Sequence, residues 1–261
     1  MTEPRQAVAH IASRDNPLLV RLRKLAQDGT AHRRAGYVWL EGEHLCSALR
    51  LRGGMPEQAV LTEAAWQDAT LRALCSGVNK VSLVSPALFA GISGLESPAA
   101  IGFLMPTPQA SAIDADAHTV VLDRLQDAGN VGSILRSAAA FGVRQVLAIK
   151  GTAALWSPKV LRAGMGAHFT LRLIEGLEQD ALHALRVPLV ATSSHGGADL
   201  ADAPLPRPCA WVLGHEGQGV SAALLARCAL QVRIPQPGGE ESLNVAAAAA
   251  VCLYESARRA G

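Results

Sequence analysis

The sequence lacks the features that mark membrane and secreted proteins. Its 261 residues contain no apolar run long enough to span a bilayer, because Arg, Asp, Gly or Pro interrupts each one. Its start, MTEPRQAVAHIASRDN, has no charged segment followed by an apolar one, as a secretory signal would. We therefore expect a cytoplasmic protein with no membrane partner.

Paired cysteines are also missing. None of the five cysteines forms a CxxC pair or stands at a zinc-ligand spacing; they are Cys46, Cys75, Cys209, Cys228 and Cys252. An odd number of separate cysteines in an intracellular chain is most simply explained by buried thiols. We expect no metal site.

The net charge of +2 at pH 7 is too small to indicate a nucleic-acid partner by itself. Its distribution is more informative, because positive charge concentrates near the N-terminus, at Arg14, Arg21, Arg23, Lys24, Arg33 and Arg34. Such a basic cluster can bind the phosphates of a nucleic acid. It can equally be the solvated face of a basic helix, and the cluster alone leaves both interpretations open.

The sequence divides into two halves with different patterns. Residues 1–104 mix helical patterns, at 18–29 and 44–54, with short strands at 37–42 and 58–64. Residues 105–117 are polar, contain proline and have no period, which indicates a linker. From 118 to 261, short apolar strands alternate with amphipathic helices.

This alternation predicts an α/β fold with a mostly parallel sheet and helices on both faces. We expect strands at 119–125, 145–151, 169–176, 188–194, 209–214 and 230–235, and helices at 131–142, 158–167, 177–186, 219–228 and 242–259. Ser157 is expected to cap the second of these helices, and Gly142 to end the first. In such sheets a ligand lies beyond the carboxyl ends of the strands, so the loops there are candidates for the site.

Two of these loops open helices. In LDRLQDAGNVGSILR, Asn130 stands at a natural capping position, and Arg136 is an isolated cation on a small, apolar helix. The alternative is a simple cap and a solvent-facing arginine, but a lone arginine on so small and apolar a helix, near the strand ends, would face the expected site. In ESLNVA, Ser242 and Asn244 precede a helix whose first turn is nearly all alanine, and Ser242 is a plausible cap.

A third loop, WVLGHEGQGVS, surrounds Glu216 with Gly214, Gly217 and Gly219, so the backbone can approach a ligand closely. A nicotinamide dinucleotide is disfavoured here. The glycines do not have the G-x-G-x-x-G spacing, the loop follows a late strand, and no acidic residue ends the next strand to hold a ribose.

Taken together, these segments resemble a known family. N-V-G-S-I-L-R (Asn130–Arg136), L-G-H-E-G-Q-G-V-S (Leu213–Ser221) and R-I-P with E-S-L-N-V-A (Arg233–Ala246) are similar to the three motifs of SpoU-type RNA methyltransferases. These form the ribose 2′-O-methylating branch of the SPOUT superfamily, also called TrmH-type enzymes. The segment 157–169 is similar as well, and the likeness spans 118–261. The first half, through 16–25 and 39–42, resembles the family's small α+β RNA-binding domain, which itself resembles a ribosomal protein.

The resemblance implies that the C-terminal segment threads through a loop to form a trefoil knot. It implies that S-adenosylmethionine binds in this knot, and that two copies form a homodimer with the active site near their interface. The implied reaction is methyl transfer to a ribose 2′-hydroxyl of structured RNA, with ribosomal RNA ahead of transfer RNA. The alternatives are a non-catalytic RNA-binding protein of the same fold and an enzyme that methylates a base.

Carried over by motif position, the catalytic and RNA-facing residues are Asn130, Arg136, Glu216, Ser242 and Asn244. The cofactor pocket would be lined by Leu213, Gly214, Gly219, Ile234 and Leu243, with Thr192 and Ser193 at a strand end nearby. A guanidinium stays protonated, with a pKa above about 12, so we expect Arg136 to hold the phosphate or the 2′-oxygen and to stabilise developing alkoxide charge. Two positions depart from the family pattern: Ala128 replaces a common proline, and Gln236-Pro237 replaces methionine and a small residue.

Overall fold

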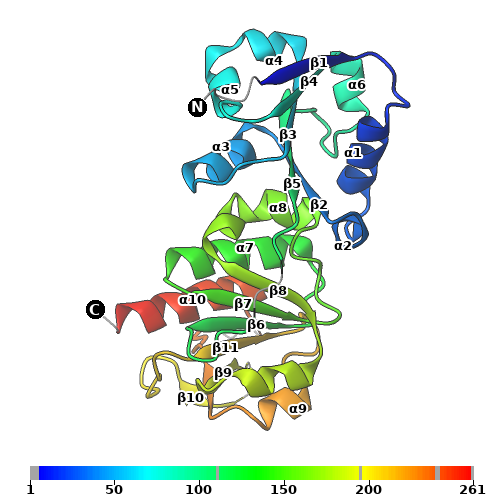
Figure 1. Cartoon of the computed structure of the whole chain (residues 1–261). Helices are drawn as coiled ribbons and strands as arrows, with labels where there is room; N and C mark the ends of the chain where they lie inside the picture. The colour runs from blue at the N-terminus through cyan, green and yellow to red at the C-terminus, as the bar shows by residue number, and fades with distance from the viewer. Residues whose placement is uncertain (1–5, 110–111, 194–195, 239–241, 260–261) are drawn as a thin grey trace. The chain divides into compact units, whose positions relative to one another are not determined.

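The computed structural model describes residues 6–109, 112–193, 196–238 and 242–259 (Figure 1). The chain divides into two compact units: Met1–Gln109 with Trp156–Phe169, and Ala110–Leu155 with Thr170–Gly261. The sequence pattern places 156–169 in a continuous second domain, whereas in the structure this segment packs with the first unit. Strand β5 (Ile101–Pro106) also extends two residues into the segment predicted as a linker.

The first unit contains a five-stranded mixed sheet in the order β1-β4-β3-β5-β2. Its strands are β1 (Ala7–Ile11), β2 (Tyr37–Glu41), β3 (Gln58–Thr62), β4 (Lys80–Val84) and β5. Its helices are α1 (Pro17–Gln27), α2 (Ala31–Ala35), α3 (Glu43–Leu51), α4 (Glu63–Gln67), α5 (Ala69–Leu74), α6 (Pro86–Ala90) and α8 (Pro158–Gly164). The helices predicted at 18–29 and 44–54 are α1 and α3, and the two predicted strands are β2 and β3.

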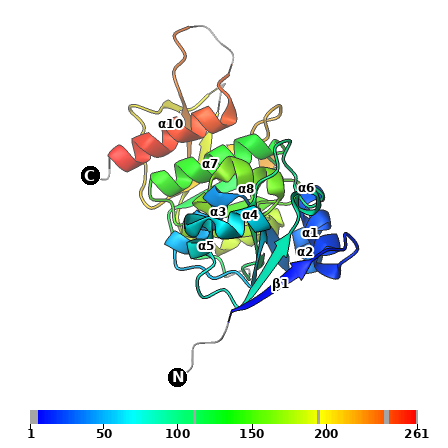
Figure 2. The same ribbon diagram turned by 90° about the horizontal axis from the view of Figure 1, so that it is seen from above.

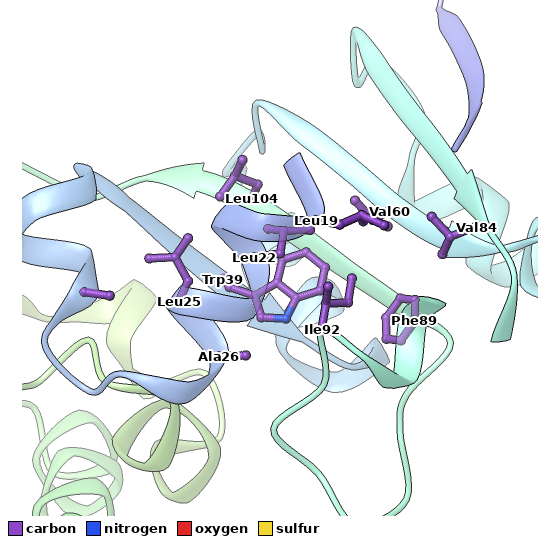
Figure 3. Packing of buried hydrophobic residues seen from close by; sticks show 11 residues of the cluster. Leu19, Leu22, Leu25, Ala26, Trp39, Val60, Val84, Phe89, Ile92 and Leu104 are labelled. Atoms are coloured by element: carbon purple, nitrogen blue, oxygen red, sulfur yellow. The ribbon is translucent and has the colours of Figure 1, made fainter. Parts of the chain in front are cut away.

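Helix α1 shows how this unit forms its core. Asn16 caps the helix, since its side chain accepts the backbone N–H of Leu18 at 2.9 Å, and Pro17 occupies the first helical position. The apolar residues that follow recur at helical spacing and are buried; they are Leu19, Leu22, Leu25 and Ala26. They pack in one cluster with Trp39 of β2 and Phe89 of α6, whose ring centroids lie 6.2 Å apart (Figure 3).

The second unit contains a seven-stranded sheet in the order β10-β12-β9-β11-β6-β7-β8, in which every neighbouring pair is parallel. The strands are β6 (Thr119–Asp123), β7 (Gln145–Ile149), β8 (Arg172–Leu177), β9 (Leu189–Thr192), β10 (Ala198–Asp199), β11 (Ala210–Gly214) and β12 (Leu230–Arg233). Helices α7 (Ala128–Ala140) and α10 (Val245–Arg258) lie side by side on one face, and α9 (Ala222–Leu225) covers the other (Figures 1 and 2). The predicted parallel sheet with helices on both faces is confirmed.

Several predicted elements differ in the structure. The helix expected at 177–186 is a short 3-10 helix, Gln179–Ala184, and the helix expected at 219–228 has a single turn, α9. The strand expected at 169–176 begins at Arg172, because Ala167–Thr170 form a 3-10 turn. Both predicted helix ends are confirmed: Ser157 accepts the N–H of Val160 at 3.4 Å, and Gly142 has a left-handed φ of 78°.

Because the second sheet is entirely parallel, the carboxyl ends of its strands lie along one edge. The pairing aligns Gly214 of β11 with Asp123 of β6, and Thr192 of β9 with Val232 of β12. This edge is where a ligand of an open α/β sheet is expected. Within the described residues, no helix has the length and apolar character that a membrane span requires.

Candidate active site

The loop after β6 presents Asn130 in the first turn of α7. The prediction that Asn130 caps this helix is wrong, because α7 begins at Ala128 and Asp127 is its cap. The carboxylate of Asp127 accepts the backbone N–H of Asn130 at 2.7 Å. With the cap already supplied by Asp127, the side chain of Asn130 is available for contacts outside the helix.

Asn244 begins α10 and joins it to α7. The prediction that Ser242 caps this helix is also wrong, since Asn244 Oδ1 accepts the N–H groups of Ala246 and Ala247 at 2.9 and 3.3 Å. The amide nitrogen of Asn244 donates to Asn130 Oδ1 at 3.0 Å. The starts of α7 and α10, 114 residues apart in the chain, therefore meet through two asparagines.

Glu216, from the loop after β11, completes this group. Its carboxylate accepts the side-chain N–H of Asn130 at 3.2 Å and the backbone N–H groups of Asp127 and Gln126 at 3.1 and 3.3 Å. Glu216, Asn130 and Asn244 thus form one hydrogen-bonded chain, which we call the polar relay. It draws its members from the ends of β6 and β11 and from the start of α10.

The hydrogen bonds to Glu216 also set its charge. Partial burial by itself raises the pKa of the Glu216 carboxyl, but N–H donors from its own backbone, Asp127, Asn130 and Gln126 together hold that pKa below its ordinary value of 4.5. When the pKa of a carboxyl is lower in the folded than in the unfolded state, its contribution to stability is fully present above the unfolded-state pKa. That contribution is lost as the pH falls through the folded-state pKa. Glu216 is therefore an ionised acceptor at neutral pH.

The other two predicted catalytic residues stand apart from the polar relay. Arg136 is exposed on α7, six residues after Asn130 and therefore about 9 Å further along the helix axis. Its guanidinium makes no hydrogen bond or ion pair with any described residue. Ser242 is exposed just before α10, and its hydroxyl likewise has no described partner. The structure thus joins Glu216, Asn130 and Asn244 and leaves Arg136 and Ser242 open to a ligand.

Most residues predicted for the cofactor lie at the carboxyl edge of the sheet. Thr192 and Gly214 end β9 and β11, and Leu213 is buried beside Gly214. Ser193 follows β9 and donates its N–H to the carbonyl of Val232 at 2.9 Å, while Ile234 directly follows β12. Leu243 lies elsewhere, next to Asn244 at the start of α10, and is 42% exposed.

Gly214 ends β11 and directly precedes the glycine loop, His215–Gly219, and no larger residue fits at position 214. A Cβ at Gly214 would lie 2.1 Å from the backbone of Gly219 and Val220. The loop is closed by two backbone hydrogen bonds between His215 and Gly219, at 3.0 and 2.8 Å, and Gly219 has a φ of 67°. By contrast, a Cβ at Gly217 would meet only the His215 ring, at 3.8 Å.

Two residues at the end of β6 also contact the glycine loop, and the sequence pattern did not identify them. Asp123 is only 1% exposed, and its carboxylate accepts the backbone N–H of Ser221 at 2.7 Å. Arg124 follows it and donates to the side chain of Gln218 at 3.1 Å. A buried acidic residue that ends an otherwise apolar strand is the signal that could have indicated them.

The basic cluster lies in the first unit, on and around α1 and α2. Part of it is engaged within the protein: Arg23 donates to the carbonyls of Gly91 and Arg14, Arg34 pairs with Asp28 at 2.9 Å, and the guanidinium of Arg21 lies 5.2 Å above the centre of the Tyr37 ring. Lys24 is exposed, as are Arg14 and Arg33. The cluster is therefore partly engaged within the protein, and its exposed members include Lys24 and also Arg14, which lies 3.7 Å from the carboxylate of Asp15.

The described residues offer no group of three or more His, Cys, Asp or Glu side chains arranged to hold a metal ion. All five cysteines are free thiols. Burial raises the pKa of Cys209 and Cys252 to about 12, so these thiols are protonated at neutral pH. The polar groups that the described site does offer are the amides, the carboxylate, the hydroxyl and the guanidinium described above.

Comparison with known proteins identifies the family of this chain. The sequence model of the SpoU rRNA Methylase family matches residues 117–254. The chain is 34% identical to an uncharacterized tRNA/rRNA methyltransferase of Synechocystis sp., over 97% of this chain and 94% of that protein. It is 31% identical to the 23S rRNA (guanosine(2553)-2′-O)-methyltransferase RlmP of Bacillus subtilis, over 82% of this chain and 86% of that one.

Among solved structures, the SpoU methyltransferase AviRb from Streptomyces viridochromogenes, in complex with the cofactor AdoMet, is similar with a TM-score of 0.83. Its sequence identity is 26%, and the likeness covers 94% of this chain and 98% of AviRb. The family match extends over more than half of the sequence and includes Asn130, Glu216 and Asn244. The chain therefore belongs to the SpoU rRNA methylase family.

Proposed function

We propose that this protein transfers the methyl group of S-adenosylmethionine to a ribose 2′-hydroxyl of ribosomal RNA. The polar relay carries this proposal, because it brings Glu216, Asn130 and Asn244 together at the carboxyl edge of a parallel sheet. The reaction agrees with that of RlmP, a 2′-O-methyltransferase of 23S rRNA, and the cofactor with that of AviRb.

The residues at the sheet edge fit S-adenosylmethionine. Gln236, three residues after β12, has a buried Oε1 with no hydrogen-bond donor among the described residues, so this acceptor suits a ligand that carries N–H groups. The glycine at 214 brings two stretches of backbone into close approach, and such bare backbone can bind a nucleoside through its N–H and C=O groups. Leu213, Gly214, Gly219, Thr192, Ser193, Ile234 and Leu243 would then hold the cofactor.

When bound, S-adenosylmethionine supplies a methyl group already activated by its sulfonium. The protein then has to hold the 2′-oxygen in line with that methyl group, an alignment worth up to roughly 7–11 kcal/mol of the barrier. The hydroxyl proton has to leave as the carbon–oxygen bond forms and the carbon–sulfur bond breaks, with S-adenosylhomocysteine as the leaving group. Arg136, which has no described partner, binds the ribose or its phosphate and stabilises negative charge on the 2′-oxygen. Ser242 and Asn244 orient the ribose from the start of α10, and Glu216 holds Asn130 in place.

Two measurements test this function. Calorimetric titration of the full chain with S-adenosylmethionine should give one saturable site, and no binding would favour a non-catalytic RNA-binding protein. Mapping 2′-O-methyl groups in total RNA from cells with and without the protein should reveal one lost position in ribosomal RNA. A lost position in transfer RNA would indicate the alternative substrate, and a lost base methyl group would contradict ribose methylation.

Gly214→Ala is expected to weaken S-adenosylmethionine binding about tenfold or more, because the new Cβ collides with the Gly219 backbone and displaces the loop. Gly217→Ala is the matched control in the same loop, since its Cβ has room. Titration calorimetry of both variants measures the difference. Equal affinities would show that the glycine loop does not line the cofactor pocket.

We further propose a division of labour along the chain: the first unit binds the RNA as an α+β domain that resembles a ribosomal protein, the segment after β5 forms the linker, and the second unit transfers the methyl group. The exposed members of the basic cluster support this division, since lysine and arginine bind phosphates without reading bases.

The double variant Arg14→Gln, Lys24→Gln is expected to weaken RNA binding and to reduce the slope of log affinity against log salt by about one to two. These positions are preferable to Arg23, whose bonds to two carbonyls also support the fold. Arg52→Gln, at the exposed end of α3, serves as a control for net charge. Filter binding across a salt series measures the slope; an unchanged slope would favour the solvated-face interpretation.

We also propose that the chain after β12 threads a loop between β9 and β11 to form the trefoil knot. Contacts at both ends of α10 support this path. Its start bonds to α7 through Asn244, and near its end Arg259 donates to the carbonyls of Leu200, Ala201 and Ala203. Arg207, from the same loop, donates to the carbonyl of Ser256 at 2.9 Å. A crystal structure that traces 234–244 outside this loop would contradict the knot.

A homodimer is part of the same proposal. Helix α10 exposes Val251 and Tyr254, 42% and 54% accessible, one turn apart on the same side. A second copy of α10 or α7 would cover these apolar groups, and sedimentation of the full chain at twice its mass is the expected result. The cytoplasmic location stays a prediction from the sequence.

A further inference from the structure

Asp123 and Arg124, at the carboxyl end of β6, form an ion pair beside the glycine loop. The Asp123 carboxylate accepts Nε of Arg124 at 2.9 Å, Nη2 of the same residue at 3.4 Å, and the backbone N–H of Ser221 at 2.7 Å. Because Asp123 is almost fully buried, its carboxylate oxygens rely on these donors for their hydrogen bonds. Asp123 therefore fixes Arg124 on one side and Ser221, two residues after the glycine loop, on the other.

The backbone of Arg124 is held in a conformation that side chains disfavour. Its φ is 62°, one of only two positive values at non-glycine residues in the described chain. Its N–H donates to Thr152 Oγ1 at 3.1 Å, and this hydroxyl in turn donates to the carbonyl of Leu122 at 3.1 Å. This geometry directs the Arg124 side chain toward the glycine loop, where Nη1 donates to Gln218 Oε1 at 3.1 Å.

The glycine loop is consequently held at two neighbouring positions by the segment that follows β6. Glu216 accepts from the N–H groups of Gln126 and Asp127, and Gln218 accepts from Arg124. We propose that Arg124 is a positioning residue, whose guanidinium links Asp123 to Gln218 and thereby fixes the glycine loop for cofactor binding and Glu216 for the polar relay. This inference rests on the proposed function of that site.

Arginine suits this task for a geometric reason. Its planar fork lets Nε and Nη2 bond to Asp123 while Nη1 reaches Gln218, whereas the single nitrogen of lysine cannot hold both partners at fixed angles. Glycine, in turn, adopts the left-handed conformation without steric cost. Arg124→Gly therefore removes the link and relieves the backbone at the same position, so the variant is expected to fold.

The test uses the full chain and S-adenosylmethionine. Arg124→Gly is expected to weaken cofactor binding about five- to tenfold, as loss of a partly exposed charge-assisted bond would. Its melting temperature should fall, because the buried Asp123 carboxylate loses its ion-pair partner, whereas Gln218→Ala leaves that pair intact and should melt close to wild type. Gln218→Ala, which removes only the far end of the link, should give the same loss. Gln218→Glu keeps an acceptor oxygen for Nη1 and should restore wild-type affinity. The double variant Arg124→Gly, Gln218→Ala should be no worse than either single variant.

Hydrogen exchange gives a second readout that does not depend on the cofactor. The amides of His215 and Gly219, which close the loop, should exchange faster in Arg124→Gly and Gln218→Ala than in wild type or Gln218→Glu. If wild type fails to bind S-adenosylmethionine, the proposed function fails, and the exchange rates still decide whether the link holds the loop. Unchanged exchange, or unchanged affinity in Arg124→Gly and Gln218→Ala when wild type binds, would overturn the inference.

Discussion

Arg136→Ala is expected to lower kcat for ribose methylation of ribosomal RNA by about 10²–10³-fold, the range found when a group that stabilises transition-state charge is removed. Arg136 is exposed on α7, and its guanidinium makes no hydrogen bond or ion pair with a described residue that would give it a role in stabilising the fold. Its loss should therefore leave the fold, the melting temperature and S-adenosylmethionine affinity unchanged. Single-turnover methylation and calorimetry on the same preparation separate the two effects.

Two further variants sharpen this test. Arg136→Lys keeps the charge but loses the planar fork, so an intermediate rate is expected if bidentate contact with the ribose or phosphate matters. Arg144→Ala removes an exposed arginine that precedes β7, at the amino edge of the sheet, and should keep full activity. Near-wild-type turnover in Arg136→Ala would remove Arg136 from the mechanism.

Asn130→Asp is expected to lower kcat roughly 10²-fold, because it breaks the polar relay at its centre. The new carboxylate still accepts from Asn244 but has no N–H to donate to Glu216, whose own carboxylate lies 3.2 Å away. Loss of a hydrogen bond to an ionised group is combined with like-charge repulsion at short range. Steady-state kinetics should show the change in kcat rather than in KM for RNA.

Variants of Asn244 distinguish the effect of the polar relay on turnover from the effect of the helix cap on stability. Asn244→Asp keeps an oxygen for the N–H groups of Ala246 and Ala247, so stability should hold, but its donor to Asn130 is lost and turnover should fall. Asn244→Ala loses both functions and should also be less stable, by about 1 kcal/mol. Wild-type turnover in Asn244→Asp would show that only the cap matters.

The sequence predicts those features of the candidate site that depend only on neighbouring residues in the chain. Glycine at 214 and 219, and an acid between them, indicate a close backbone turn whatever surrounds them. The alternation of apolar strands and helices after residue 118 likewise predicts a parallel sheet. The strands of such a sheet are buried on both faces and are apolar throughout, whereas the covering helices are buried on one face and are apolar at helical spacing. Both the parallel sheet and the helix ends at Ser157 and Gly142 follow from such local rules.

The helix starts at the site could not be predicted in the same way. Asp127 and Asn130 are both good caps, as are Ser242 and Asn244, and propensity alone does not choose between neighbours. Which residue caps each helix is decided by the tertiary contacts that the candidate side chains make. Asn130 bonds to Glu216 and Asn244, so Asp127 caps α7, and Asn244 both caps α10 and donates to Asn130.

By itself, then, the sequence determined the parallel sheet and the loops that carry polar residues at its carboxyl edge. Only the tertiary structure decided which of those residues meet: it joined Glu216, Asn130 and Asn244, left Arg136 and Ser242 open, and added the Asp123–Arg124 pair. It also grouped Trp156–Phe169 with the first unit. The physical reason is that periodicity and propensity act over a few residues, whereas these contacts join segments up to 114 residues apart.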